Sequence, residues 1–146
     1  MFYAEDLAAG QRFALGSYTI SEEEIVGFAK QYDPVPIHTD KEAAAAGPFG
    51  GLIASGFNTL AIYQRLIVEA VWTQVAGIVG RSFEVRLSHL VRPGTLITGH
   101  SQIQSITLRP KRRDGIVIFR TELTDGSGQT LLTLVLDALI HSRPSS

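Results

Sequence analysis

A carboxyl group and an imidazole stand close together in the stretch Asp33-Pro34-Val35-Pro36-Ile37-His38. Two such groups can divide the work of a general acid and a general base between them. Each proline fixes its own φ angle and pushes the residue before it toward an extended conformation, so this stretch is predicted to be a stiff loop. Asp33 and His38 are therefore the candidate catalytic residues.

A second chemical feature follows further along the chain, where the glycine pair Gly50-Gly51 leads through Ala54-Ser55-Gly56-Phe57 into an apolar helical pattern. The first turn of a helix has free backbone N–H groups, which favour negative charge nearby. An acid–base pair and a helix start together suit a reaction that passes through an oxyanion.

Helical signals dominate the first half of the chain, after one predicted strand at Arg12–Thr19. Ser21 and Glu24 match the serine-x-x-glutamate capping box of a helix start. This helix must end before Asp33, because the proline that follows disfavours α geometry at that residue. Asp33 therefore begins the stiff loop that follows the helix.

Two more helices are predicted before the second half. Lys41–Ala46 has room for one or two turns, with Asp40 as its N-cap. The longest helical pattern runs from Ser55 to Trp72 and is apolar around most of its surface, which is typical of a buried core helix. Its apolar positions are Phe57, Leu60, Ala61, Tyr63, Ile67, Val68 and Val71.

The second half alternates between apolar and polar residues, as strands do. Turn signals separate four predicted strands at 82–87, 95–106, 116–123 and 129–140. Strands linked by hairpins imply an antiparallel sheet. A long buried helix with such a sheet makes an α+β domain in which the sheet curls around the helix. We treat residues 1–146 as a single domain, because the sequence contains no linker or repeat.

The composition excludes several classes of function. There is no cysteine, so disulfides, thiolate metal sites and cysteine nucleophiles are ruled out. His89, His100 and His141 have no metal-site spacing, and we expect neither a metal nor a cofactor. A net charge of −1 gives no attraction for nucleic acid or an anionic membrane. The start lacks a signal peptide and no apolar run is long enough to span a membrane, so we expect a soluble cytoplasmic protein.

The Asp–His stretch resembles the signature of the MaoC-like family of hotdog-fold hydratases and dehydratases, which includes the (R)-specific enoyl-CoA hydratases. Many members have Tyr-Asp-Pro-Gln-Pro before an aliphatic residue and the histidine, close to Tyr32-Asp33-Pro34-Val35-Pro36 in this chain. Further similarity lies in Phe-Gly-Gly-Leu-Ile-Ala-Ser-Gly at 49–56 and Leu-Val-Arg-Pro-Gly at 90–94. The resemblance covers nearly the whole chain and implies a hotdog fold, an antiparallel curled sheet wrapped around a long central helix.

The resemblance also implies a reaction, in which water is added to an enoyl thioester or removed from a 3-hydroxyacyl thioester. His38 would take a proton from water as the water oxygen attacks Cβ, and Asp33 would deliver a proton to Cα. The backbone N–H of Gly56 would bind the thioester carbonyl oxygen. The substrate pocket would be lined by Ser55, Phe57 and Asn58.

The implied substrate is a thioester of coenzyme A or of an acyl carrier protein. The hotdog resemblance further implies a homodimer or a dimer of dimers, in which sheets pair edge to edge. The active site would lie at the dimer interface, or the partner would shape the acyl tunnel. Such pairing would also remove a free sheet edge, which is otherwise an aggregation hazard.

Three positions depart from the family pattern. Val35 stands where the family has Asn or Gln, Asn58 where many close relatives have His, and Gln64 where some (R)-specific hydratases have Ser. These differences leave the acyl chain length and branching open. Two other functions stay open as well: a hotdog thioesterase, and a non-catalytic acyl-binding domain that has lost activity.

Structural explanations compete with the functional ones. An Asp before a proline can simply cap a turn, as Asp33 would. His38 can be a buried structural histidine, and Gly56 can serve tight packing alone. A basic cluster beside the Asp114-Gly115 turn is either a solvated hairpin tip or a contact for carrier phosphates; its members are Arg109, Lys111, Arg112 and Arg113.

Overall fold

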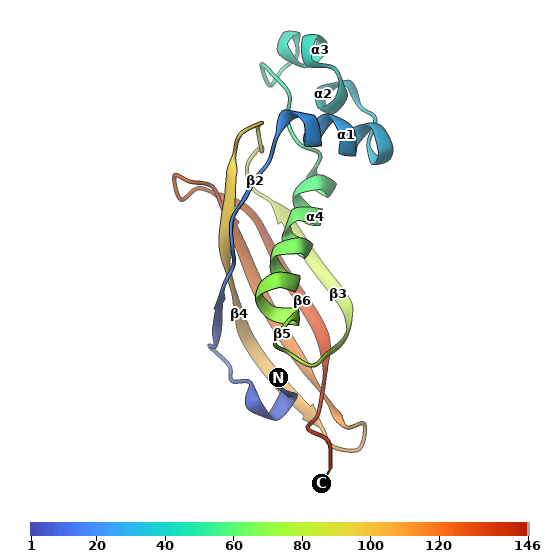
Figure 1. The fold of residues 1–146 in the computed structure, drawn as a ribbon, viewed down its shortest axis with the longest axis vertical. Coiled ribbons are helices and arrows are strands. Elements are labelled where there is room, and N and C mark those ends of the chain that lie inside the picture. The colour runs from blue at the N-terminus through green and yellow to red at the C-terminus, as the bar shows by residue number, and fades with distance from the viewer. Residues whose placement is uncertain (146) are drawn as a thin grey trace.

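A central helix lies against one face of a curled antiparallel sheet in the computed structural model, which describes residues 1–145 (Figure 1). Three shorter helices gather beyond the N-terminal end of the central helix, at one end of the sheet. The helices are α1 (Glu22–Tyr32), α2 (Pro36–Thr39), α3 (Lys41–Ala46) and α4 (Gly56–Ile67). This arrangement confirms the predicted α+β architecture.

Helix α1 begins where the capping signal predicts. The Ser21 hydroxyl accepts a hydrogen bond from the backbone N–H of Glu24 at 3.0 Å. The other half of the capping box is wrong, because the Glu24 carboxylate turns away from the backbone and accepts hydrogen bonds from the side chains of Tyr18 and Asn58. The helix ends at Tyr32, so that Asp33 is its C-cap, as predicted.

The stretch after Asp33 is not the loop that the two prolines suggested. Pro36–Thr39 forms a single turn of helix, α2, with Pro36 at its first position. Proline suits that position, because the first N–H of a helix has no partner within it and the fixed φ angle is already helical. Asp40 then caps α3 as predicted, and its carboxylate accepts from the N–H groups of Glu42 and Ala43.

The long helix spans the predicted range. Ser55 is the N-cap of α4, and a π-helical turn, Val68–Trp72, continues the helix to its predicted end. The prediction that this helix is buried nearly all round is wrong, since Phe57 is 67% exposed and Val68 is also exposed. The face that packs on the sheet is formed by Thr59, Ile62, Tyr63, Leu66, Ile67 and Val71.

The sheet has the order β1-β4-β5-β6-β3, and β2 also pairs with β4. The predicted strand at Arg12–Thr19 is broken into two short strands with Gly16 between them. The last three predicted strands of the C-terminal half lie within a few residues of the observed bounds. The strands are β1 (Arg12–Ala14), β2 (Tyr18–Thr19), β3 (Gly77–Leu87), β4 (Leu96–Arg109), β5 (Asp114–Thr124) and β6 (Thr130–His141).

Strand β3 is an edge strand that pairs only with β6 within the part of the chain described. It starts at Gly77, five residues earlier than the alternating pattern indicated, and every one of its residues is exposed. Its exposed apolar side chains are Ile78, Val79, Phe83, Val85 and Leu87.

The core lies between α4 and the concave face of the sheet. It joins the buried side of the helix to the central strands, with Phe119 of β5 fully buried between Phe13 and Trp72. Because this core fixes α4 on the sheet, it also fixes the start of the helix at the end where α1, α2 and α3 lie.

Candidate active site

Asp33 stands at the C-terminal end of α1. Its backbone N–H donates to the carbonyl of Ala29 at 2.8 Å, which closes the last turn of the helix. The carboxylate oxygen Oδ2 accepts a hydrogen bond of 2.7 Å from the hydroxyl of Ser55. Its side chain is 27% exposed, so one side of the carboxyl group remains open to a ligand.

His38 lies in α2 and is 8% exposed. Its Nδ1 is 2.7 Å from the backbone carbonyl oxygen of Ile53. A carbonyl oxygen can only accept, so Nδ1 carries the hydrogen, and in the neutral ring Nε2 has a free lone pair. Nε2 is the nitrogen that faces Asp33, at 3.5 Å from Oδ2.

The structure therefore brings together the two residues singled out by the sequence. A separation of 3.5 Å is too long for a strong hydrogen bond. It is short enough for both groups to contact the same small molecule at their open side. One imidazole nitrogen able to take a proton and one carboxyl group able to give or take a proton thus stand side by side.

Ser55 connects this pair to the central helix. It is fully buried, and its hydroxyl accepts from the N–H of Phe57 while it donates to Asp33. The sequence singled out Ser55 as a pocket residue, and the structure places it behind the carboxyl group as its hydrogen-bond donor. The helical pattern placed Ser55 at the start of the helix, and the structure makes it the N-cap, whereas its bond to Asp33 depends on how α1 docks.

Gly56 is the first residue of α4, directly after Ser55. The N–H at this position of a helix has no partner within the helix. A methyl group on the Gly56 α-carbon would lie 2.4 Å from Cδ1 of Leu87, so the absent side chain lets β3 pack closely against the helix start. Gly56 therefore combines an available donor with a tight contact, and its position is compatible with both predicted roles.

The other two predicted pocket residues lie in different surroundings. Phe57 is exposed and lines an open apolar notch with Phe28 and Tyr32. Asn58 is 2% exposed, and its amide group donates to the carboxylate of Glu24 at 3.0 Å. Glu24 thus lies close to the candidate site, although the sequence indicated only a helix-capping role for it.

Val35 is the N-cap of α2, and its side chain is exposed. Its backbone carbonyl accepts from the N–H groups of His38 and Thr39. The residue therefore holds α2 through its backbone.

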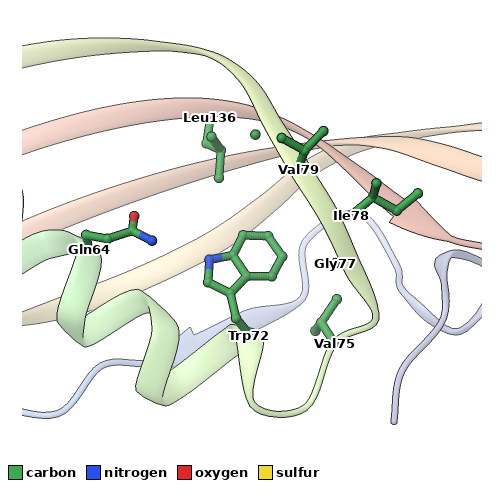
Figure 2. Close-up of a pocket in the computed structure, with 8 residues that line it drawn as sticks. Gln64, Trp72, Val75, Gly77, Ile78, Val79 and Leu136 are labelled. Carbon is green, nitrogen blue, oxygen red and sulfur yellow. The ribbon is translucent and has the colours of Figure 1, made fainter.

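Two cavities, lined mainly by apolar side chains, lie between α4 and the edge strand β3. One of about 290 Å³ is shown in Figure 2, where Gln64 and Trp72 project towards Leu136 and Val79. A second, of about 180 Å³, lies nearer the helix start and begins at Leu60. The two share Gln64, Gly80 and Leu136 as lining residues. Leu60 is four residues after Gly56, about 6 Å along the helix axis, so the cavities extend away from the candidate donor.

Neither a metal site nor a membrane helix emerges from residues 1–145. These residues contain no cluster of three or more metal-ligating His, Asp or Glu side chains. Within the same range, every helix is too short or too polar to cross a membrane. The basic cluster at 109–113 lies at the opposite end of the sheet from α1 (Figure 1), and Arg109 is paired with Asp114 at 2.7 Å.

A curled antiparallel sheet around one long helix, with the helix start facing a carboxyl–imidazole pair, defines a hotdog-fold protein. The MaoC like domain model matches residues 6–124. The chain belongs to this family, whose members are dehydratase- and hydratase-type enzymes.

Known proteins agree with this assignment. The MaoC-like dehydratase of Rhodospirillum rubrum superposes with a TM-score of 0.92 at 32% identity, covering 99% of this chain and 100% of that one. The 3-hydroxyacyl-thioester dehydratase Z of Mycobacterium tuberculosis is 49% identical over 61 residues, which are 40% of each chain. The (R)-hydratase of A. caviae shares the fold, with a TM-score of 0.74 at 21% identity over 95% of this chain and 99% of that one. The matched segments span less than half the length of the curated relatives.

Proposed function

We propose that this protein adds water to enoyl thioesters and removes it from 3-hydroxyacyl thioesters. The observation that carries the proposal is the free Nε2 of His38, held 3.5 Å from the Asp33 carboxyl group by the Ile53 carbonyl. The matching family of hydratase- and dehydratase-type enzymes supports the same class of reaction.

In the hydration direction, the pair starts with one proton, on Asp33. His38 Nε2 takes a proton from water while the water oxygen bonds to Cβ. The electrons of the Cα–Cβ double bond move to the thioester oxygen, where the N–H of Gly56 stabilises the negative charge. Asp33 then delivers its proton to Cα and the carbonyl reforms.

One water molecule has now been added, and the single proton of the pair has moved from Asp33 to His38. The two groups are close enough for this proton to return, directly or through solvent. Dehydration follows the same steps in reverse, with Asp33 taking the Cα proton and His38 giving its proton to the leaving hydroxyl. Ser55 holds one carboxylate oxygen throughout, which leaves the other for substrate.

The acyl chain of the substrate fits the cavities between α4 and β3. The nearer cavity begins one helical turn beyond Gly56, and both are lined mainly by apolar side chains. A second proposal concerns the unpaired edge of β3, which we expect to bind a second copy of this chain. This strand has unpaired backbone groups along its edge and also exposed apolar side chains, and both features favour pairing with another strand.

A turnover assay tests this function directly. The purified protein is mixed with crotonyl-CoA and longer enoyl-CoA thioesters, and loss of the conjugated enoyl absorbance reports hydration. We expect Asp33→Asn and His38→Ala each to lower kcat by about 10²–10⁴-fold. Asp40→Asn and His89→Ala are matched controls, since Asn caps a helix as well as Asp does and His89 is exposed.

Other outcomes would point to the two remaining functions. Release of free thiol without hydration would identify a thioesterase. Tight binding of thioesters with no turnover across the panel would identify a non-catalytic binding domain. Wild-type rates in either Asp33→Asn or His38→Ala would contradict the proposed mechanism.

A further inference from the structure

Three side chains from three elements meet beside the start of α4. The carboxylate of Glu24, in the first turn of α1, accepts a hydrogen bond from the Tyr18 hydroxyl of β2. Its second oxygen accepts from the Asn58 amide of α4 at 3.0 Å. Glu24 and Tyr18 are half-buried, whereas Asn58 is almost fully buried. This cluster lies outside the Asp33–His38 pair, and the proposed reaction does not use it.

Helix α1 is tied to the same turn of α4 at both of its ends. Near its start, Glu24 bonds to Asn58, and at its C-cap Asp33 bonds to Ser55. Glu24 and Asp33 are nine residues apart, about 13 Å along a helix axis. Ser55 and Asn58 are only three residues apart, at the N-cap and the third helical position. The angle and position of α1 on α4 are therefore set by two separate hydrogen bonds.

Asn58 lowers the stability of the fold at this position. Its Oδ1 is buried and has no hydrogen-bond partner within the described part of the chain. A buried acceptor without a partner is destabilising, and a leucine of similar size would avoid that cost while still filling the core. What Asn58 provides, and a leucine would not, is the hydrogen bond from its amide to the Glu24 carboxylate.

We infer that the Glu24–Asn58 hydrogen bond is a positioning device for the Asp33–His38 site. It fixes α1 on α4 and so holds the Asp33 carboxyl group at its place beside Ser55 and the Gly56 N–H. The inference rests on the proposed function, in which Asp33 exchanges a proton with substrate bound at that N–H. Glu24 and Asn58 touch neither the carboxyl group nor the imidazole in the contacts given above, so both act through the docking of α1.

A positioning role affects the chemical step more than substrate binding. Misplacing a catalytic group by about 1 Å can lower a rate by about 10²-fold. Loss of the Glu24–Asn58 bond is therefore expected to lower kcat by about 10–100-fold while KM changes little. A purely structural role would instead lower the fraction of folded protein and leave the kinetics of that fraction unchanged.

A pair of reciprocal substitutions tests this inference. In Asn58→Asp, two carboxylates face each other in place of a donor and an acceptor, so kcat should fall. In Glu24→Gln alone, the amide of Asn58 can flip and accept with its free Oδ1, so the effect should be small. When Glu24→Gln is combined with Asn58→Asp, the introduced glutamine amide donates to the introduced carboxylate, and the glutamine oxygen still accepts from Tyr18. This double variant should recover most of the lost kcat.

The control is Ala61→Asp, which adds the same charge to an exposed position of α4. It should leave kcat close to that of the wild type. Hydrogen exchange of α1 amides provides a second measurement that needs no substrate: it should rise in Asn58→Asp and return to the wild-type level in the double variant. Wild-type kcat and exchange in Asn58→Asp, or no recovery of either in the double variant, would overturn the inference. A wild-type protein without turnover would overturn the proposed function instead, and the exchange data would still decide whether the bond docks α1.

Discussion

Nδ1 of His38 lies 2.7 Å from the backbone carbonyl oxygen of Ile53, just before the start of α4. Because the carbonyl can only accept, this contact determines which imidazole nitrogen carries the hydrogen and which is free. The same segment continues through Ser55, which holds Asp33, to the N–H of Gly56. A few residues before the helix therefore orient the imidazole of His38, the carboxyl group of Asp33 and the candidate oxyanion donor together.

His38→Asn tests whether the free nitrogen is the base. The asparagine Nδ2 can take the place of the ring Nδ1 and donate to the Ile53 carbonyl, but nothing replaces Nε2. We expect kcat for hydration to fall by about 10²–10⁴-fold while the melting temperature stays near that of the wild type. Stopped-flow turnover and thermal unfolding measure the two quantities. An active His38→Asn variant would show that Nε2 is not needed.

Gly56→Pro tests the helix-start N–H, because proline has none. Proline is tolerated at the first position of a helix, and the Ser55 ψ angle of 141° is one that a residue before proline adopts. Leu87→Ala is included in the background, since Leu87 would contact any new side chain at this position. The control is the double variant Gly56→Ala with Leu87→Ala, which keeps the N–H. We expect kcat of Gly56→Pro with Leu87→Ala to be about 100-fold below that of this control. Equal rates in the two double variants would exclude this donor.

Gly80→Val tests whether the acyl chain occupies the cavities between α4 and β3. Gly80 lines both of them, and a Cβ there would lie 3.1 Å from Leu136 Cδ1, so a valine narrows the place where they meet. We expect kcat/KM for long enoyl-CoA thioesters to fall by about tenfold or more, with crotonyl-CoA unchanged. All acyl chain lengths are assayed with one preparation of the variant, so the rate with crotonyl-CoA is the internal control. An equal loss for all lengths would place the chain elsewhere.

Local signals were enough to predict much of the site. Ser21 and Asp40 are N-caps as predicted, because each precedes a helical pattern and a cap depends only on near neighbours. The convergence of Asp33 and His38 was predicted from the spacing and from the family resemblance. The two prolines predict a loop after Asp33, whereas the structure has the single helical turn α2 there, because proline suits the first position of a helix.

Features that depend on the order of the strands could not be predicted from the sequence. The alternating pattern in β3 is typical of a strand with one buried face, yet the strand is exposed throughout, because cavities separate its inner face from α4. Phe57 looked like a core residue because helical periodicity does not tell which elements cover the helix. The Asp33–Ser55 bond and the cavities depend on how distant elements pack, which no local pattern records.

The ion pair of Arg109 and Asp114 makes the free energy of unfolding depend on pH in the acidic range. The Arg109 guanidinium holds the pKa of the Asp114 carboxyl below its usual value of 3.8. This stabilisation is present above pH 3.8 and is lost as pH falls through the lower pKa of the folded state. Asp114→Asn should therefore be less stable than the wild type near neutral pH, and the difference should vanish in strong acid. Urea unfolding at a series of pH values measures it, with Lys111→Met as a control that removes another charge from the same turn.

Tyr63 makes the protein sensitive to alkali. Burial raises the pKa of its phenol to about 12, from the ordinary value of 10.0. The nearby Thr121 hydroxyl offsets only part of this rise, because it donates to Ser101 and does not form a hydrogen bond with Tyr63. Between these two pKa values the unfolded chain loses the proton while the folded protein keeps it, so stability must fall as pH rises from about 10 to about 12.

Tyr63→Phe should remove this alkaline loss, which amounts to about 2–3 kcal/mol once both states are ionised. Near neutral pH the same variant should be as stable as the wild type or more so, because it removes a buried hydroxyl that has no hydrogen-bond partner among the described residues. Denaturant unfolding from neutral to strongly alkaline pH measures both effects, with Tyr32→Phe as an exposed control. A loss of stability near neutral pH in Tyr63→Phe would show that the hydroxyl has a partner after all, with Thr121 as the first to examine by substitution to Val.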